Sequence, residues 1–297
     1  MEPHSKVLIT GINGFTGKYL KKYLQENHHE VFGISNQIEK AENNIFQCNI
    51  NDKEALVKVL KKIQPDYIIH LAAISFVMHA DIEEIYKVNV IGTQNLLDAS
   101  IEVKHNLKKI ILASSATVYG NQDSTVLNEN MCPNPLNHYG ISKLAMEFVA
   151  KTYFEKLPII ITRPFNYTAP GHGEQFVIPK IARAFINKQE NLELGNLNVY
   201  REYNSIYFVC EVYFKLMKSA TTSEIVNIAS GQTHSLNEII LLFEQATNHK
   251  LKVKINPNFV RKDEIERLAG NTDKLNQIIK IDNNYSINNV IKSFLSY

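Results

Sequence analysis

The sequence predicts an α/β fold: a doubly wound parallel sheet followed by a smaller, less regular C-terminal lobe. Three observations predict it. Strand-like and helix-like segments alternate over roughly the first half of the 297 residues. The strand-like segments are continuous apolar runs, which is typical of strands covered on both faces. A glycine-rich turn also stands directly between the first strand and the first helix.

The first half of the chain carries the regular part of this pattern. Residues 6–11 (KVLITG) form a short β-rich run, and residues 17–27 place Tyr19, Leu20 and Leu24 at helical spacing. The other strands are expected at 30–35, 66–73, 108–115 and 157–165, and the other helices at 53–63, 85–100 and 138–154. Because strands and helices alternate, neighbouring strands should run parallel.

Beyond about residue 166 the pattern loosens. A turn-rich loop (166–176) comes first, and the end of the chain is polar and rich in asparagine. Helices are expected at 178–188 and 236–247, and strands at 224–230 and 252–257. We therefore expect one domain over residues 1–165 and a smaller lobe over residues 166–297, with about 195–235 returning in part to the first domain.

Composition and charge exclude several classes of protein. The chain is 44% hydrophobic and 21% charged, with a net charge of +2, as in ordinary globular proteins, and it has no basic stripe for nucleic acid. Three widely spaced cysteines without a CxxC motif indicate neither a metal site nor a disulfide framework. We see no apolar signal core and no apolar run of about 18 residues, so we expect a cytoplasmic protein that does not contact membranes.

The turn TGINGFTG (10–17) indicates nucleotide binding. Gly11 allows a tight turn, Gly14 lets backbone amides approach a pyrophosphate, and Gly17 allows close packing of the helix on the strand. The N-terminus of the helix then favours the negative charge. Residues 1–165 are thus expected to bind a dinucleotide.

The end of the second strand favours one dinucleotide over the other. Sites specific for NAD usually place a carboxylate there, which bonds the ribose hydroxyls. This chain has GISNQ (33–37) instead, and Ser35 and Asn36 could hydrogen-bond a 2′-phosphate. We therefore expect NADPH, with NADH possible, because no arginine stands in this loop to hold the phosphate.

The stretch HYGISK (138–143) places Tyr139 four residues before Lys143, so that both lie on one face of a helix. An ammonium beside the phenol should lower the pKa of the tyrosine from about 10 toward neutrality, which suits a proton donor or acceptor. Taken alone, this spacing is more often that of an ordinary surface pair, because YxxxK is common by chance.

Six segments together resemble extended short-chain dehydrogenases/reductases of the NDP-sugar epimerase/dehydratase group. The resemblance covers nearly the whole chain and rests on GINGFTG (11–17), HLAA (70–73), VNVIGT (88–93), SSATVYG (114–120), YGISK (139–143) and RPFN (163–166). It implies a Rossmann-like domain and a C-terminal substrate-binding lobe. It further implies a homodimer formed by the helices near 82–101 and 139–155.

The resemblance also assigns roles to single residues. It implies that Tyr139 is the catalytic acid/base, that Lys143 lowers its pKa and bonds the nicotinamide ribose, and that Ser115, with Thr117, holds the reacting oxygen. The positions expected to bind the cofactor, besides Tyr139 and Lys143, are Gly11, Asn13, Gly14, Phe15, Thr16, Gly17, Ser35, Asn36, Asn49, Ile50, Leu71, Ala72, Ala73, Asn89 and Pro164. The positions expected to bind the substrate are Ser75, Ser115, Thr117, Asn166, Arg201 and Arg261. For the outer positions, a packing or capping role remains an alternative.

The segment after the catalytic serine separates the possible reactions. The 4,6-dehydratases of this group carry acidic residues there, whereas this chain has Ala116 and Thr117 and so lacks that general acid and base. The segment 195–217 is similar to the GNL-x-x-x-R-D-F segment of GDP-4-keto-6-deoxy-D-mannose reductases, with Arg201 at the arginine that contacts the diphosphate and Glu202 in place of the aspartate. We therefore expect NAD(P)H-dependent reduction of the C4 keto group of a nucleotide-diphospho-4-keto-6-deoxyhexose. An NAD-dependent 4-epimerase is the main alternative, and a dehydratase or a non-catalytic nucleotide-binding regulator are further ones.

Overall fold

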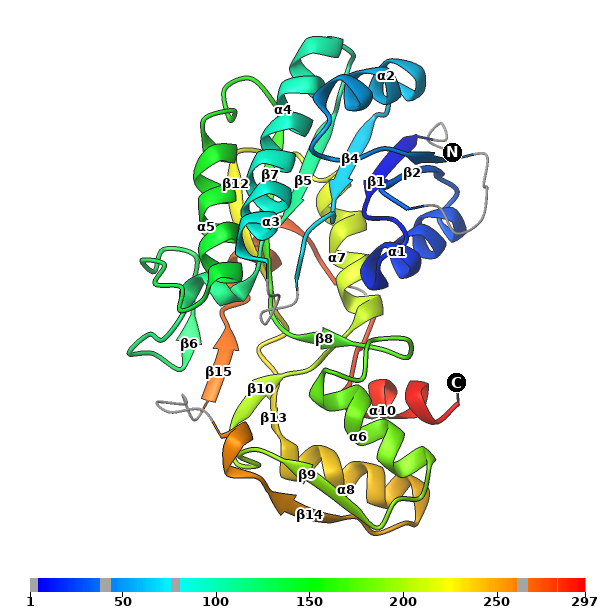
Figure 1. Cartoon of the computed structure of the whole chain (residues 1–297), viewed down its shortest axis with the longest axis vertical. Coiled ribbons are helices and arrows are strands. Elements are labelled where there is room, and N and C mark those ends of the chain that lie inside the picture. The colour runs from blue at the N-terminus through cyan, green and yellow to red at the C-terminus, as the bar shows by residue number, and fades with distance from the viewer. Residues whose placement is uncertain (1–4, 38–43, 76–80, 261–266, 282, 297) are drawn as a thin grey trace.

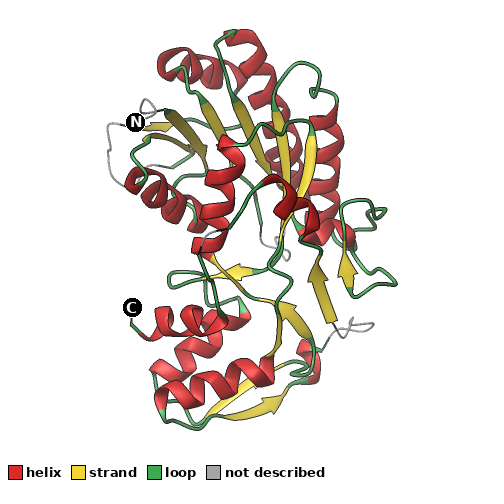
Figure 2. Ribbon diagram, turned by 180° about the vertical axis from the view of Figure 1, so that it is seen from behind, coloured by secondary structure: helices red, strands yellow, loops and turns green. Residues whose placement is uncertain are grey.

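The computed structural model describes residues 5–37, 44–75, 81–260, 267–281 and 283–296 (Figure 1). A parallel sheet with helices on both sides forms one part of the molecule, and a smaller mixed part lies beside the carboxyl ends of its strands (Figure 2). Within the described residues, no helix combines the length and apolarity needed to cross a bilayer.

Seven parallel strands form the main sheet, in the order β12-β7-β5-β4-β1-β2-β3. The strands are β1 (Lys6–Thr10), β2 (Glu30–Ser35), β3 (Ile45–Gln47), β4 (Tyr67–His70), β5 (Lys109–Ala113), β7 (Ile159–Pro164) and β12 (Glu224–Ile228). The order reverses between β1 and β4, which is where open α/β sheets bind their ligands. The predicted doubly wound, Rossmann-like sheet is thus confirmed.

Alternate residues of the strands enter two separate cores. Val7 and Ile9 of β1 pack in the core that includes helices α1 and α7, whereas Leu8 packs in the core that includes α2, α4 and α5. All three side chains are fully buried, and each contributes roughly 1.5–3 kcal/mol by the hydrophobic effect. The helices are α1 (Phe15–Glu26), α2 (Lys53–Ile63), α4 (Gly92–Val103), α5 (His138–Lys151) and α7 (Ile206–Lys218).

The helix expected at 85–100 differs from the prediction in its middle. It begins as α3 (Ile82–Tyr86), passes through one π-helical stretch (Lys87–Ile91) and continues as α4 without a break. A π stretch holds one residue more per turn than an α-helix and therefore rotates the side chains that follow it. Asn89 lies in this stretch and is buried.

The smaller part has its own apolar core. Phe185 and Phe243 stack there with their ring centroids 5.2 Å apart. The elements that build it are helices α6 (Val177–Ile186), α8 (Leu236–Thr247) and α10 (Ile287–Leu295), and the parallel strands β9 (Asn191–Leu194) and β14 (Lys252–Ile255). The end of the chain is therefore not merely a polar tail, because it contains α10 and also α9 (Asp273–Ile278), which packs against the main sheet.

Two small sheets connect the parts. One has the strand order β13-β10-β15-β6, and the other pairs β8 with β11. Their strands are β6 (Val126–Leu127), β8 (Tyr167–Thr168), β10 (Tyr200–Glu202), β11 (Asn204–Ser205), β13 (Thr233–Ser235) and β15 (Arg267–Gly270). Strand β12 belongs to the main sheet and helix α7 packs against that sheet, so segments from both sides of residue 165 contribute to this part of the molecule. The domain boundary itself stays a prediction.

Candidate active site

The structure brings the three predicted catalytic residues together at the carboxyl end of β5. Ser115 follows β5 and caps a short 3₁₀ helix (Ala116–Tyr119), while Tyr139 and Lys143 lie in the first turns of α5. The Ser115 side chain lies close enough to the Tyr139 phenol to lower the pKa of that phenol. Thr117 Oγ1 donates to Ser115 Oγ at 2.9 Å, so the three hydroxyls form one cluster. Asn137 starts α5 by accepting a hydrogen bond from Gly140 N at 2.9 Å, which fixes the helix end that carries Tyr139.

Lys143 is buried below this cluster. Its Nζ donates to the carbonyl oxygen of Ala113 at 2.7 Å, and the residue is only 4% exposed. Burial lowers the pKa of the Lys143 amine to about 8, and the carboxylate of Glu147, one helical turn away, opposes this effect.

The expected lowering of the Tyr139 pKa is wrong for this structure. Burial of the phenol raises its pKa above the ordinary value, the nearby Tyr167 adds to the rise, and the hydrogen bond with Ser115 opposes it. The sequence showed the lysine at i+4 but not the burial, and the amine of Lys143 is engaged by Ala113. Tyr139 is therefore held as a neutral phenol, which is the protonation state that a proton donor requires.

The glycine turn has the close contacts that its spacing predicts. Gly11 has a φ of +71°, and a Cβ on it would lie 2.9 Å from the backbone of Ala72. A Cβ on Gly17 would lie 2.4 Å from the carbonyl oxygen of Gly11. These contacts allow the turn, the first helix and the end of β4 to approach one another as a dinucleotide site requires.

A cavity of about 200 Å³ lies beside this turn, between the ends of β1, β2 and β4. It is lined by seven of the predicted cofactor residues, namely Gly11, Ser35, Asn36, Asn49, Ile50, Ala72 and Ala73. Sequence reasoning missed five others, Ile34, Cys48, Ile74, Glu84 and Val88. Glu84 was not detectable because it comes from α3, far along the chain from the glycine turn. The open backbone of the turn and the mixed polar and apolar lining fit the adenosine end of a dinucleotide.

Several predicted cofactor residues have protein partners. Ser35 Oγ donates to the carbonyl oxygen of Gln37 at 2.6 Å, and Asn13 Nδ2 donates to the same oxygen at 3.1 Å. Asn49 Oδ1 accepts from the backbone N–H of Asn51 at 3.0 Å. An amide or hydroxyl oxygen has two lone pairs, so each can still accept one further bond.

Other predicted cofactor residues make contacts to the smaller part or lie at strand ends. Phe15 stacks on His172 with the ring centroids 4.2 Å apart, and Thr16 Oγ1 lies 2.8 Å from the hydroxyl of Tyr167. These two contacts join the start of α1 to β8 and to the loop that follows β8. The remaining two, Leu71 and Pro164, lie at the carboxyl ends of β4 and β7 and are partly buried.

Asn89 acts on the site through a loop. Its Oδ1 accepts from Ile74 N at 2.8 Å, and its Nδ2 donates to Ile74 O at 3.1 Å and to Ser142 Oγ at 3.0 Å. The side chain therefore ties the loop after β4, which lines the cavity, to helix α5, which carries Tyr139 and Lys143.

The predicted substrate residues are more widely spread. Ser75 and Asn166 are exposed and follow β4 and β7 at the carboxyl edge of the main sheet. Arg201 lies on β10 of the connecting sheet, where its Nη1 donates to the carbonyl oxygen of Tyr200 at 2.8 Å. Arg261 lies outside the described residues. These assignments stay predictions.

The curated proteins that resemble nearly the whole chain include two enzymes named for GDP-6-deoxysugars. GDP-6-deoxy-D-talose 4-dehydrogenase of Aggregatibacter actinomycetemcomitans is 34% identical over 278 residues, which are 93% of this chain and 92% of the relative. GDP-6-deoxy-D-mannose reductase of Pseudomonas aeruginosa is 27% identical over 302 residues, which are 98% of this chain and 96% of the relative.

Solved structures agree with the fold. A protein from Burkholderia cenocepacia J2315 assigned as an epimerase superposes with a TM-score of 0.92 at 31% identity, covering 100% of both chains. RMD from Pseudomonas aeruginosa, complexed with NADPH, gives a TM-score of 0.86 at 26% identity, covering 98% of this chain and 96% of that one. The family model described as GDP-mannose 4,6 dehydratase matches residues 8–294. This chain therefore belongs to the GDP-mannose 4,6-dehydratase family of extended short-chain dehydrogenases/reductases.

Proposed function

We propose that this protein uses NADPH to reduce the C4 keto group of a GDP-linked 4-keto-6-deoxyhexose. The observation that carries the proposal is the cluster of Ser115, Thr117 and a protonated Tyr139 above a buried Lys143. The GDP group is supported by the two curated relatives, which are both named for GDP-6-deoxysugars. NADPH is supported by the carboxylate-free sequence after β2 and by the NADPH in the RMD structure.

The clustered side chains suit the transfer of a proton to the C4 oxygen of the sugar. When bound, the reduced nicotinamide supplies the hydride that C4 accepts. Tyr139 then donates its phenolic proton to O4 as that oxygen gains negative charge, and the hydroxyls of Ser115 and Thr117 hold the same oxygen. Lys143 stabilises the phenolate that remains, because an amine that titrates at about 8 is largely protonated at neutral pH.

A dehydratase reaction is poorly supported, although the family model carries a dehydratase's name. Such a reaction moves protons at C5 and C6 of the sugar and needs a carboxylate near the catalytic hydroxyl. In this chain that segment is the 3₁₀ helix Ala116–Tyr119, whose side chains include no acid. Thr117 instead donates to Ser115, which suits the binding of the sugar oxygen.

A 4-epimerase is the second candidate, favoured by the resemblance to the Burkholderia protein. An epimerase oxidises and re-reduces C4 with the same residues and retains its NAD throughout. The two functions therefore differ in whether the cofactor is consumed, which a single assay can measure.

The test is to follow nicotinamide absorbance with purified protein, NADPH or NADH, and GDP-, dTDP-, UDP- or CDP-linked 4-keto-6-deoxyhexoses. We expect NADPH to be consumed with the GDP sugar and not when the sugar is omitted. NMR of the product then gives the C4 configuration, in which 6-deoxy-D-talose and 6-deoxy-D-mannose differ. No consumption with any sugar, together with NAD that copurifies with the protein, would exclude the reductase and favour the epimerase.

We also propose that the protein acts in the cytoplasm as a homodimer. Four exposed apolar side chains lie on α3, the π stretch and α5, which are neighbouring helices (Figure 1): Ile82, Ile91, Ile141 and Phe148. Pairing of this surface with its copy would bury them as a four-helix bundle. Light scattering after size-exclusion chromatography should give twice the chain mass of 33.9 kDa, and Phe148→Asp should shift it toward the monomer.

A further inference from the structure

A buried ion pair lies directly beneath the catalytic cluster. Arg163 Nη2 of β7 donates to Glu147 Oε2 of α5 at 2.6 Å, and Arg163 Nε donates to Glu147 Oε1 at 2.9 Å. The two residues are only 2% and 1% exposed. Neither residue belongs to the reacting group in the mechanism above.

The carboxylate of this pair also reaches the catalytic residues. Ser114 Oγ donates to Glu147 Oε1 at 2.6 Å, and Ser114 directly precedes Ser115 in the chain. Glu147 also lies four residues after Lys143 on the same face of α5, and both are buried. One carboxylate is therefore linked to both the serine segment and the lysine.

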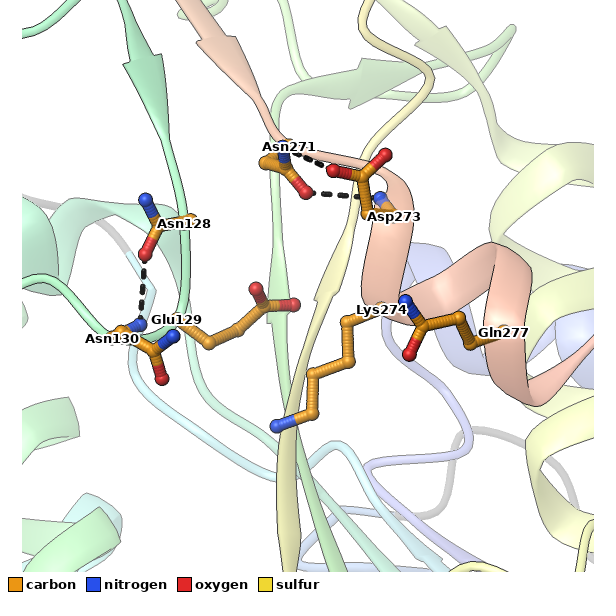
Figure 3. Close-up of a pocket in the computed structure, with 7 residues that line it drawn as sticks. All are labelled: Asn128, Glu129, Asn130, Asn271, Asp273, Lys274 and Gln277. Atoms are coloured by element: carbon orange, nitrogen blue, oxygen red, sulfur yellow. Dashed lines mark hydrogen bonds between the residues drawn. The ribbon is translucent and has the colours of Figure 1, made fainter.

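The network continues away from the active site. The guanidinium of Arg163 lies over the ring of Tyr119, 4.7 Å from its centroid, and the Tyr119 hydroxyl donates to Asn227 Oδ1 at 2.7 Å. Asn227 N in turn donates to Glu129 Oε1 at 2.7 Å. Glu129 and Lys274 extend from opposite sides into a polar cavity of about 430 Å³ (Figure 3). The ion pair is thus the end of a polar chain that begins at this cavity.

Stability alone does not explain such a pair. Replacing a buried ion pair by apolar residues of similar size is often neutral or stabilising, because desolvation costs about as much as the charges gain. A carboxylate that accepts a hydrogen bond from the segment of Ser115 and acts electrostatically on the amine of Lys143 has a more specific use.

We propose that Glu147 is a positioning residue of the reaction, which fixes the Ser114–Ser115 segment through one hydrogen bond and keeps Lys143 charged through its own negative charge. The expected effects on kcat rest on the proposed function. The expected effect on the charge of Lys143 does not, because it is measured in the protein without substrate.

The other groups that face Lys143 do not supply this charge. His70 on β4 is buried between Thr10 and Thr93, which lowers its pKa to about 3 and keeps it neutral at physiological pH. Burial raises the pKa values of Tyr139 on α5 and Tyr167 on β8, so both are neutral as well. Arg163 on β7 is cationic: burial lowers its pKa, but the hydrogen bonds and the charge of Glu147 outweigh burial and raise it above the ordinary value. Within the described part of the chain, Glu147 is thus the anionic group that opposes the effect of burial on Lys143.

The first test measures the Lys143 amine directly. The titration is followed by NMR of protein labelled at the lysine side chains, with Lys143→Arg to assign the signal. Glu147→Gln should lower the titration midpoint of Lys143 by about one pH unit. Because this variant leaves Arg163 buried without its partner, the double variant Glu147→Gln/Arg163→Gln is measured as well, and it should show a shift of the same sign.

The second test separates position from charge. Ser114→Ala removes the hydrogen bond and leaves both charges, so we expect kcat to fall by about 3–10-fold with an unchanged Lys143 midpoint. Ser100→Ala is the matched control, since Ser100 is equally buried on α4 and its hydroxyl donates to the carbonyl oxygen of Leu96. It should leave kcat unchanged.

The outcomes distinguish this inference from the proposed function. In the variants that lack Glu147, the alkaline limb of the kcat/KM profile should move to lower pH together with the NMR midpoint. If the midpoint is the same in the wild type and in both folded variants, the inference is wrong even where activity falls. If the midpoint moves while the wild type reduces no keto sugar, the proposed function is wrong and the electrostatic role of Glu147 stands.

Discussion

Gly14 and Gly17 stand in the same turn, but the structure predicts different consequences for replacing them with alanine. In Gly17→Ala the new Cβ would lie 2.4 Å from the carbonyl oxygen of Gly11 and 2.6 Å from that of Ile12, both of them backbone atoms that cannot swing away. Overpacking of this kind costs about 1–3 kcal/mol or more. In Gly14→Ala the nearest atom would be Gly11 O at 3.2 Å, and Gly14 has a φ of −69°, which any residue adopts. We expect a loss below about 1 kcal/mol there.

Gly14→Ala should lose more affinity for NADPH, whereas Gly17→Ala should lose more stability. Gly14 caps α1, where backbone amides approach the pyrophosphate, so a methyl group there should weaken NADPH binding by about tenfold or more. The assay is urea unfolding without cofactor, followed by a titration of NADPH that is monitored by its fluorescence. Gly17→Ala should lose the larger part of its stability before any cofactor is added. Equal destabilisation of the two variants, or normal NADPH affinity in Gly14→Ala, would refute this account of the turn.

Three further changes test the site and its support. Tyr139→Phe should keep the fold and the NADPH affinity but lower kcat by about 10²–10⁴-fold, whereas Tyr153→Phe, just beyond the same helix, should keep activity; equal losses in both would contradict the role of Tyr139. His70 titrates near 3 when folded and near 6.5 when unfolded, so the unfolded chain binds the extra proton and stability should fall by about 1.4 kcal/mol per pH unit as the pH drops from 6 toward 3. Urea unfolding over that range should show this slope reduced in His70→Asn and kept in the exposed control His28→Asn. Glu202→Ala should cost about 1–3 kcal/mol of stability for each donor left unpaired, because the buried Glu202 carboxylate accepts hydrogen bonds from two backbone N–H groups and a side-chain amide. It should also raise KM, because Glu202 follows Arg201, which is predicted to bind substrate. An unchanged unfolding midpoint and KM would exclude this role.

The main sheet was predictable because its strands are buried on both faces and therefore appear as continuous apolar runs. Strand β3 (Ile45–Gln47) was missed because three residues are too few for any periodic signal. Helix α10 was missed although Ile287, Val290, Ile291 and Phe294 follow helical spacing, since the many asparagines around them suggested an irregular tail. Its burial comes from packing in the smaller core, which composition does not show.

The candidate catalytic cluster was predictable because Ser115, Tyr139 and Lys143 stand in short motifs with fixed spacing. Its electrostatics were not, since the pKa of Tyr139 depends on how deeply the phenol is buried and on Tyr167, which comes from another strand. The position of Glu84 was not predictable either, because it lines the cavity beside the glycine turn from α3. A sequence motif thus specifies which groups meet, whereas the rest of the fold sets their protonation.

Asn89 shows most directly what the fold adds to the motif. An asparagine is a poor choice for a helix interior, and a regular α-helix would turn its side chain in a different direction. The π stretch rotates it so that it bonds both backbone groups of Ile74 and the hydroxyl of Ser142. These three hydrogen bonds compensate for the unfavourable helix geometry, and they tie the cavity loop to the catalytic helix. One side chain thus links the loop that lines the cavity to the helix that carries Tyr139.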